Sequence, residues 1–292
     1  MEIAFIGLGR MGAPMALNLL AAGHALHVHD IDPRAEESVL AAGARRAPGP
    51  AAAARVAEAV ISSVPGPAEV DAVMTGEDGV LAAAREGLLV IETSTIGPGQ
   101  SRDLARRFAE RGADYVDAPV NRIAADGAAR RDMTIMVGGD ANAFARARPV
   151  LECLGDRIHH VGPTGTGNAV KLLNQMIYLS CVAVFCEGLA LGQRLGVPRE
   201  TLLAIFETSA AGHATIGDTH ARIAAGDESP GFAVDRVLKD LGLADALRAE
   251  AEFAAPGFAA ALAAYRRASE AGYGAADMTV LRRLLAEPGP EA

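Results

Sequence analysis

Lysine is rare in this chain, and its rarity draws attention to two positions. Of the 27 lysines and arginines, 25 are arginines, and the exceptions are Lys171 and Lys239. An arginine stays protonated near neutral pH, whereas a lysine can lose its proton when burial or a nearby cation disfavours the ammonium. Two interpretations are open at this point. The two lysines are either leftovers of codon bias or positions that need an amine able to exchange a proton.

Lys171 has polar neighbours at helical spacing. Asn174, Gln175 and Tyr178 follow it at positions that share one face of a helix. Amides beside an amine can hold a substrate hydroxyl or carboxylate while the amine takes or gives a proton, and such proton transfer is typically worth ~10²–10⁴ in rate. The alternative for Lys171 is a helix lysine that extends its ammonium to solvent. The alternative for its polar neighbours is that they merely close a domain interface. Lys239 has its own alternative, an ion pair with Asp235 or Asp240.

A glycine pattern follows the first apolar run. Gly7, Gly9 and Gly12 form a G-x-G-x-x-G turn, whose glycines permit a tight turn, close approach of a pyrophosphate and close helix–strand packing. The helix that begins there offers free N–H groups to phosphates. The next strand ends at Asp30, whose carboxylate can accept the ribose hydroxyls of NAD and would repel the 2′-phosphate of NADP. Arg34 lies close enough to weaken that preference, and a solvated strand-end carboxylate is the alternative for Asp30.

The order of elements predicts an α/β domain followed by an all-helical one. Short β-rich runs alternate with helical stretches up to residue 162, which predicts βαβ units in a parallel, doubly wound, Rossmann-type sheet. The predicted strands are 3–6, 25–29, 59–63, 88–92, 114–117 and 134–137, with helices such as 11–22, 35–42, 67–73 and 99–111. The predicted helices of the second domain, 163–292, are 168–195, 199–209, 215–224, 233–252, 258–271 and 278–285.

The bulk composition argues against several classes of protein. A net charge of −9 does not suit a broad nucleic-acid or anionic-membrane surface, which needs clustered lysine and arginine. The three cysteines have no metal-ligand spacing and predict a reduced, intracellular protein without a metal. No signal peptide is visible, and the longest apolar run, 176–186, is too short to span a bilayer. We therefore expect a soluble, cytoplasmic protein.

Several motifs, in order along nearly the whole chain, resemble those of one family. They are the glycine turn with its continuation Ala13-Pro14-Met15, Glu92-Thr93-Ser94-Thr95, Asp117-Ala118-Pro119-Val120, Thr134-Ile135-Met136-Val137-Gly138-Gly139, the run from Gly165 to Gln175, and Lys239-Asp240-Leu241-Gly242. The chain resembles the β-hydroxyacid dehydrogenases, which include 3-hydroxyisobutyrate dehydrogenase and tartronate semialdehyde reductase. The family fold, a Rossmann domain and a helical domain on a long interdomain helix, agrees with the predicted elements.

The resemblance implies an activity and the residues that carry it. An NAD-dependent member oxidises the primary alcohol of a small anionic hydroxy acid or reduces the matching semialdehyde. The positions that match cofactor contacts are Gly7, Leu8, Gly9, Arg10, Met11, Gly12, Asp30, Val64, Pro65, Thr95 and Lys239. Lys171 matches the catalytic lysine, and Asn174 and Gln175 follow it as substrate-binding candidates. Both lysines thus fall on positions where the family uses lysine.

One departure from the family pattern bears on the substrate. After Asp-Ala-Pro-Val the family usually has Ser-Gly-Gly, whereas this chain has Asn121, Arg122 and Ile123, and Arg131 stands where a glycine is usual. An arginine in this segment resembles the sulfolactaldehyde reductase branch. Its planar guanidinium binds sulfonate or carboxylate oxygens through charge-assisted hydrogen bonds. We expect Arg122 to bind the substrate anion with support from Asn121; an arginine turned to solvent or to a domain seam is the alternative.

Other functions fit parts of the pattern less well. An imine reductase shares the fold but generally has another residue at position 171, and decarboxylating phosphogluconate dehydrogenase needs a longer helical domain. A non-catalytic dinucleotide-binding scaffold would be expected to lack Lys171. The Ala-rich helical half carries more apolar surface than one small domain buries, which predicts a homodimer or homotetramer.

Overall fold

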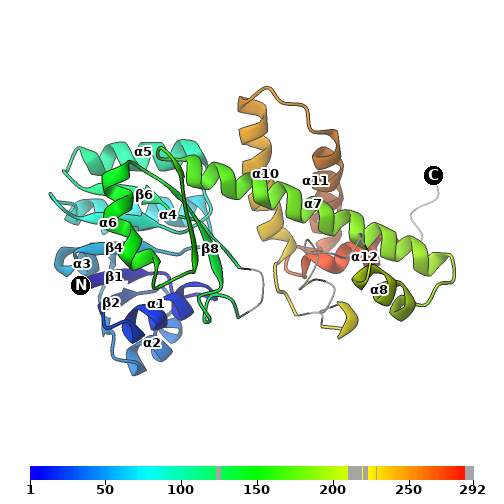
Figure 1. Cartoon of the computed structure of the whole chain (residues 1–292), viewed down its shortest axis with the longest axis horizontal. Coiled ribbons are helices and arrows are strands. Elements are labelled where there is room, and N and C mark those ends of the chain that lie inside the picture. The colour runs from blue at the N-terminus through cyan, green and yellow to red at the C-terminus, as the bar shows by residue number, and fades with distance from the viewer. Residues whose placement is uncertain (123–125, 210–218, 220–222, 228, 287–292) are drawn as a thin grey trace. The chain divides into compact units, whose positions relative to one another are not determined.

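The computed structural model describes residues 1–122, 126–209, 219, 223–227 and 229–286. It divides into two compact units, 1–171 and 172–292 (Figure 1). The division falls inside a long helix, α7 (Thr166–Arg194), whereas the sequence places the domain boundary after residue 162. The two units are described separately below.

The first unit is built on one sheet, and each of the six predicted strands is present within a residue at either end. Its strands are β1 (Glu2–Ile6), β2 (Ala25–His29), β3 (Arg45–Arg46), β4 (Ala59–Ser62), β5 (Leu89–Glu92), β6 (Asp114–Asp117), β7 (Val120–Arg122), β8 (Met133–Gly138) and β9 (Arg157–Gly162). Their order is β3-β2-β1-β4-β5-β6-β8-β7, with β9 also paired to β8. From β3 to β6 every pairing is parallel, as the alternation of strands and helices predicts.

The far edge of the sheet differs from the expected all-parallel arrangement. β8 runs antiparallel to both β6 and β7 and parallel to β9. Pro119 interrupts the chain between β6 and β7, and a proline cannot donate a ladder hydrogen bond. The strands β3, β7 and β9 were not predicted. β3 and β9 lack apolar alternation, since they carry Arg45 and Arg46 or His159 and His160.

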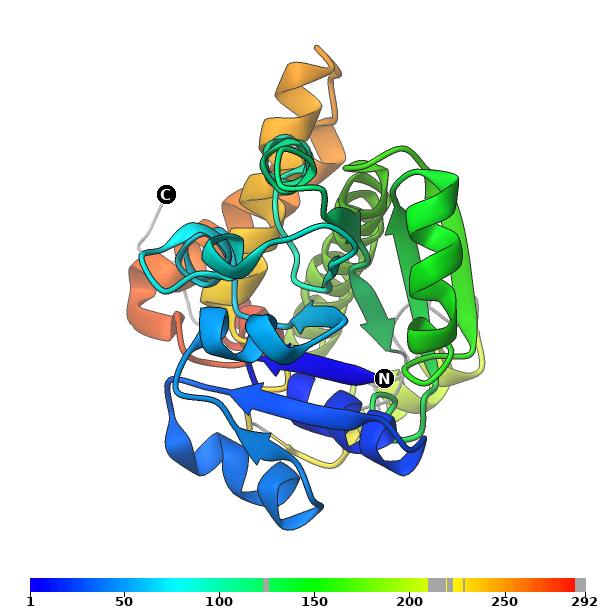
Figure 2. The same cartoon turned by 90° about the vertical axis from the view of Figure 1, so that its left-hand side faces the viewer.

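Alternate residues of each strand point to opposite faces, and each face has its own core. Ile3 and Phe5 belong to one core with α1 (Gly12–Ala21), α2 (Glu37–Ala41) and α6 (Ala141–Leu151). Ala4 and Ile6 belong to the other, with α3 (Pro50–Val56), α4 (Pro67–Thr75) and α5 (Pro98–Ala109). The helices lie on both sides of the sheet (Figures 1 and 2), which makes this unit a doubly wound α/β domain.

The described part of the second unit is helical. Besides most of α7 it contains α8 (Arg199–Glu207), α10 (Val234–Glu250), α11 (Pro256–Ala268) and α12 (Leu281–Ala286). A π-helical turn, Ser269–Tyr273, and a 3-10 turn, Met278–Val280, connect α11 to α12. The core of this unit joins α7 to α10, α11 and α12 around the buried Tyr265. The predicted helix 215–224 lies largely outside the described residues.

Helix α7 is long and apolar enough, by length and composition alone, to cross a bilayer. Its apolar stretch, residues 166–190, has a mean hydropathy of 1.6. The buried residues Leu172, Leu179, Val182 and Cys186 pack into the core of the second unit. A core helix of a soluble protein has the same composition, so the hydropathy alone does not make α7 a membrane helix.

Candidate functional site

The glycine turn between β1 and α1 has the geometry that its sequence predicts. Gly7 has a φ of +89°, and a Cβ on it would meet the carbonyl oxygen of Ser63 at 2.3 Å. A Cβ on Gly12 would meet the carbonyl oxygen of Gly7 at 1.9 Å, so only glycine lets α1 start this close to the strand. Gly9 faces open space, with no atom within 4 Å of a built Cβ. The exposed Gly9 is therefore where a phosphate can approach the backbone.

Asp30 lies at the end of β2, directly beside this turn. Its carboxylate accepts hydrogen bonds from the backbone N–H groups of Leu8 (2.6 Å) and Asp32 (2.8 Å). These bonds orient the carboxylate and leave lone pairs for further donors. The exposed Arg34 donates from Nε to Asp32 Oδ1 (3.0 Å). The arginine that weakened the predicted preference for NAD is thus paired with a neighbouring aspartate.

The loops after β4 and β5 contain three more of the predicted cofactor residues, Val64, Pro65 and Thr95. Val64 donates its backbone N–H to Ser94 Oγ (2.9 Å), and Thr93 Oγ1 donates to the carbonyl oxygen of Ser62 (2.7 Å). These bonds tie the two loops together at the carboxyl edge of the sheet. Thr95 is half-buried in the second loop, while Pro65 is exposed in the first. Met11 is half-buried and Arg10 exposed in the glycine turn.

Lys171 is buried in the first unit and contacts the unusual segment. Only 6% of its surface is exposed, and its Nζ donates to Asn121 Oδ1 at 2.5 Å. Asn121 belongs to β7, opposite Thr134 of β8. The sequence predicts that Asn121 supports Arg122, whereas the structure joins Asn121 to the lysine. Because β7 was not predicted, this contact could not be derived from the spacing of the residues.

The remaining residues of that segment are placed in part. Arg122 is the half-buried last residue of β7, opposite Met133, and Ile123 lies outside the described residues. Arg131 has a φ of +60°, in the left-handed region that favours glycine. This explains why a glycine is usual there, and the arginine carries a conformational cost of about 1–2 kcal/mol.

The first turn of α7 is held against the carboxyl ends of the strands. Asp117, buried at the end of β6, accepts hydrogen bonds from the backbone N–H groups of Gly165 and Asn168, each at 2.7 Å. A Cβ on Gly167 would meet the carbonyl oxygens of Met136 and Asp117 at 2.5 and 2.6 Å. The glycines before Lys171 therefore allow the helix to begin in contact with the sheet. The motif match did not reveal this role of Asp117.

In the second unit three polar residues form a chain. Gln175 Nε2 donates to Asp240 Oδ2 (2.6 Å), and Lys239 Nζ pairs with Asp240 Oδ1 (2.6 Å). Gln175 and Asp240 are buried, whereas Lys239 is partly exposed and Asn174 half-buried. The ion pair with Asp240 is the alternative that the sequence left open for Lys239. The sequence pointed to Asp240 only as an ion-pair partner of Lys239, and its hydrogen bond to Gln175 was missed. The available signal for that bond was that Asp240 is adjacent to Lys239.

Both parts of the chain match family models. Residues 2–162 match the NAD binding domain of 6-phosphogluconate dehydrogenase, and residues 165–285 match the model described as the NAD-binding domain of NADP-dependent 3-hydroxyisobutyrate dehydrogenase. The chain belongs to the β-hydroxyacid dehydrogenase family. It is an NAD-dependent oxidoreductase of hydroxy acids, and its first unit is the family's NAD-binding domain.

Relatives cover almost the whole dehydrogenase. The NAD-dependent L-serine dehydrogenase of Pseudomonas aeruginosa is 38% identical over 97% of both chains. The 3-sulfolactaldehyde reductase of Escherichia coli is 35% identical over 96% of this chain and 94% of its own. The crystal structure of 3-hydroxyisobutyrate dehydrogenase from Salmonella typhimurium is 30% identical, with a TM-score of 0.90 over 97% of this chain and 99% of that one. These relatives favour a dehydrogenase over an imine reductase or a non-catalytic scaffold.

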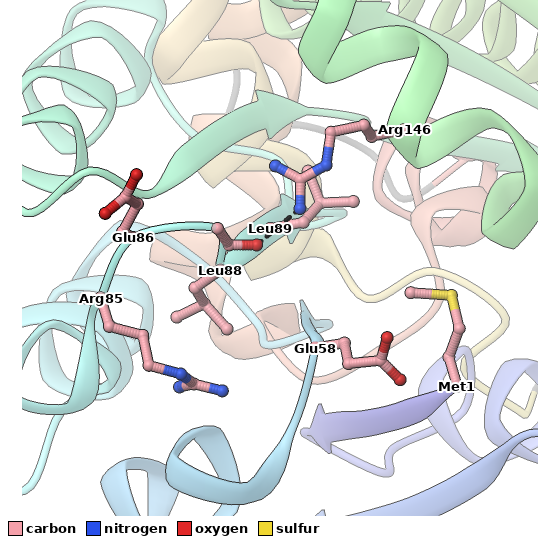
Figure 3. Close-up of a pocket in the computed structure, with 8 residues that line it drawn as sticks. Met1, Glu58, Arg85, Glu86, Leu88, Leu89 and Arg146 are labelled. Atoms are coloured by element: carbon pink, nitrogen blue, oxygen red, sulfur yellow. Dashed lines mark hydrogen bonds between the residues drawn. The ribbon is translucent and has the colours of Figure 1, made fainter.

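A cavity of about 380 Å³ lies at the opposite edge of the sheet of this dehydrogenase. It is lined by residues that precede or begin β1, β4 and β5, among them Met1, Glu58 and Leu88 (Figure 3). Arg85 donates there to the carbonyl oxygens of Ala54 (3.0 Å) and Ala57 (2.6 Å). Ligands of doubly wound sheets bind at the carboxyl ends of the strands, and this arginine is engaged in closing the end of α3. We therefore assign the cavity no role in the chemistry.

Glu92 is a buried carboxyl group that the sequence singled out only as part of a motif. It ends β5 in register with Asp117 of β6, and it accepts the backbone N–H of Ser94 at 2.7 Å. Burial raises the pKa of Glu92 to about 7, with a smaller contribution from the neighbouring Asp117 carboxylate. Desolvation likewise raises the pKa of Asp117, against the lowering effect of its two N–H donors. Among the described residues no group of three or more His, Cys, Asp or Glu could hold a metal ion.

The raised pKa of Glu92 predicts a pH-dependent cost to folding. Below an unfolded pKa of 4.5 the residue is protonated in both states; between 4.5 and about 7 only the folded state keeps the proton, so stability falls as the pH rises. Glu92→Gln removes this ionisable group. We therefore expect the free energy of unfolding of the variant, relative to the parent, to increase across this window by roughly 3 kcal/mol at most and to level off above it. Urea unfolding at several pH values measures this difference. The exposed Glu86→Gln is the control, and a pH-independent difference for Glu92→Gln contradicts the assignment.

Proposed function

We propose that the enzyme transfers hydride between NAD(H) and a small anionic 3-hydroxy acid or its semialdehyde, with Lys171 as general acid and base. One observation carries the proposal. The glycine turn follows β1, while Asp117 at the end of β6 holds the helix turn that leads to Lys171. Because β1, β4, β5 and β6 are parallel, a dinucleotide-binding turn and a buried amine belong to the same edge of one sheet.

The reaction needs a hydride acceptor and a proton acceptor. A nicotinamide cofactor held by the glycine turn and Asp30 would supply the hydride chemistry at the carbinol carbon. Lys171, as the neutral amine, takes the hydroxyl proton in oxidation; as the ammonium, it polarises the carbonyl oxygen and returns the proton in reduction. Its hydrogen bond to Asn121 fixes the position of Nζ.

Asp30 and the segments around Val64 and Thr95 are proposed to bind NAD, and faster turnover with NADPH than with NADH would argue against the role of Asp30. Cofactor contact by Lys239 and substrate contact by Asn174 and Gln175 stay predictions.

Replacing Lys171 tests this function directly. We expect Lys171→Met to lower kcat by ~10²–10⁴ with the best substrate of a panel that includes glyoxylate, succinic semialdehyde, tartronate semialdehyde and sulfolactaldehyde. Lys171→Arg keeps the charge but cannot release a proton, so it should lose a similar factor. NADH binding, followed by fluorescence, should change little in both variants. Reduction at nearly the parental rate in Lys171→Met would rule out the proposed mechanism, and NADH binding without turnover of any substrate would favour a scaffold.

We further propose that Arg122 binds the anionic group of the substrate. Arg122 directly follows Asn121, which contacts Lys171, and this segment replaces the small residues usual in the family. Arg122→Ala is expected to lower kcat/KM for sulfonate and carboxylate semialdehydes by at least tenfold, while uncharged aldehydes of similar size lose less than threefold. The exposed Arg130→Ala is the control, since Arg130 pairs with Asp126. Equal losses on charged and uncharged substrates would remove Arg122 from the anion site.

We also propose that the enzyme is a cytoplasmic homo-oligomer that associates through α7. Leu173, Ile177 and Val184 are 48%, 60% and 63% exposed and lie on one side of this helix, at the spacing of a helix–helix seam. Ile177→Asp should shift the protein to monomers in sedimentation at micromolar concentration. The same change at Val56, which is 52% exposed on α3, should leave the oligomer intact. A parent protein that sediments as a monomer would contradict the proposal.

A further inference from the structure

Asn168 is a completely buried asparagine in the first turn of α7, and the structure gives it three polar contacts. Its backbone N–H donates to Asp117 Oδ2 at 2.7 Å. Its side-chain Oδ1 accepts the backbone N–H of Ile96 at 3.0 Å, and its Nδ2 donates to Ser101 Oγ at 3.1 Å. Ile96 and Ser101 are themselves buried. One carboxamide therefore connects α7 to the loop after β5 and to the first turn of α5.

The loop on the other side of this bond is the one proposed to approach the cofactor. Ile96 directly follows Thr95, and Ser94 of the same loop accepts the backbone N–H of Val64 at 2.9 Å. Val64 and Thr95 are both proposed cofactor-binding residues. The bond between Ile96 and Asn168 thus joins the cofactor-binding loops to the start of α7.

Lys171 lies three residues after Asn168, on the same side of the helix, and both side chains are buried. We infer that Asn168 is a positioning residue that couples the Thr95 loop to the first turn of α7 and so fixes Lys171 for proton transfer. This inference rests on the proposed role of Lys171. A displacement of about 1 Å at a reacting group can cost ~10²-fold in rate, so loss of the coupling has a measurable effect on kcat.

The chemistry of the side chain explains why an asparagine stands here. The Ile96 N–H needs an acceptor and the buried Ser101 hydroxyl can accept, so the side chain must offer both an acceptor and a donor. A serine suits the first turn of a helix but is too short to reach either partner. An aspartate has the same shape, and complete burial favours its neutral form, which keeps the oxygen that accepts from Ile96 and offers an O–H to Ser101. The two substitutions therefore separate the contact from the fold.

The experiment compares Asn168→Ser and Asn168→Asp in the full-length enzyme, with NADH and the semialdehyde that the parent turns over fastest. Asn168→Ser is expected to lower kcat at least tenfold, to move the ionisation seen in the pH profile of kcat, and to leave the Kd of NADH within threefold of the parent. Asn168→Asp is expected to restore kcat to within threefold. Asn18→Ala is the matched control, because Asn18 also makes a tertiary hydrogen bond in this unit, from Nδ2 to the carbonyl oxygen of Ala128 (2.8 Å).

The outcomes separate this inference from the proposed function. The positioning role would be overturned if the kcat of Asn168→Ser stayed within twofold of the parent. It would also be overturned if the Ser and Asp variants lost kcat by the same factor and NADH affinity by the same factor. A third outcome would overturn the positioning role as well: Asn168→Ser fails to fold, and Asn168→Asp folds with a lower kcat but an unchanged pH profile. The residue would then be only structural. If Lys171→Met stays active, the proposed function fails instead. An inactive Lys171→Met beside a fully active Asn168→Ser refutes the coupling alone.

Discussion

The buried carboxylate of Asp117, which accepts two backbone N–H groups at the start of α7, is the interaction on which the site depends. An ionised carboxylate away from water is costly unless several donors satisfy it. Here the donors are the N–H groups of Gly165 and Asn168, which the helix itself leaves unpaired, and the positive end of the helix dipole adds to the attraction. The two hydrogen bonds therefore offset both the cost of burying the carboxylate and the cost of leaving N–H groups at the start of the helix unpaired. It also places the beginning of α7 at the carboxyl edge of the sheet, one turn before Lys171.

The parts of the fold that follow from local pattern could be predicted from the sequence. The six buried strands and most helices have clear apolar periodicity, and the glycine turn and Asp30 form a motif with a known mechanism. The long helix was predicted at 168–195 and found at Thr166–Arg194. The scarcity of lysine led to Lys171, which is buried as a proton-exchanging amine requires. Apart from the lysine count, which is a property of the whole chain, each of these signals lies within a few neighbouring residues.

Contacts between distant residues could not be predicted in this way. Asn121 and Lys171 are brought together by β7, a short strand that follows a proline and whose pattern is too brief to recognise. Asn168 accepts the backbone N–H of Ile96, which lies 72 residues earlier in the chain. Asp117 matched a motif, but its function as a helix-capping group depends on where α7 begins. Comparison of motifs thus singled out residues, whereas the contacts of those residues became visible only in the tertiary structure.

The two lysines differ in the partners that the structure shows for them, and the difference suits two kinds of chemistry. Lys239 pairs with the carboxylate of the buried Asp240. Lys171 donates to the neutral amide oxygen of Asn121. A guanidinium could replace the first lysine as a fixed cation, but it could not exchange a proton, as the function proposed for Lys171 requires.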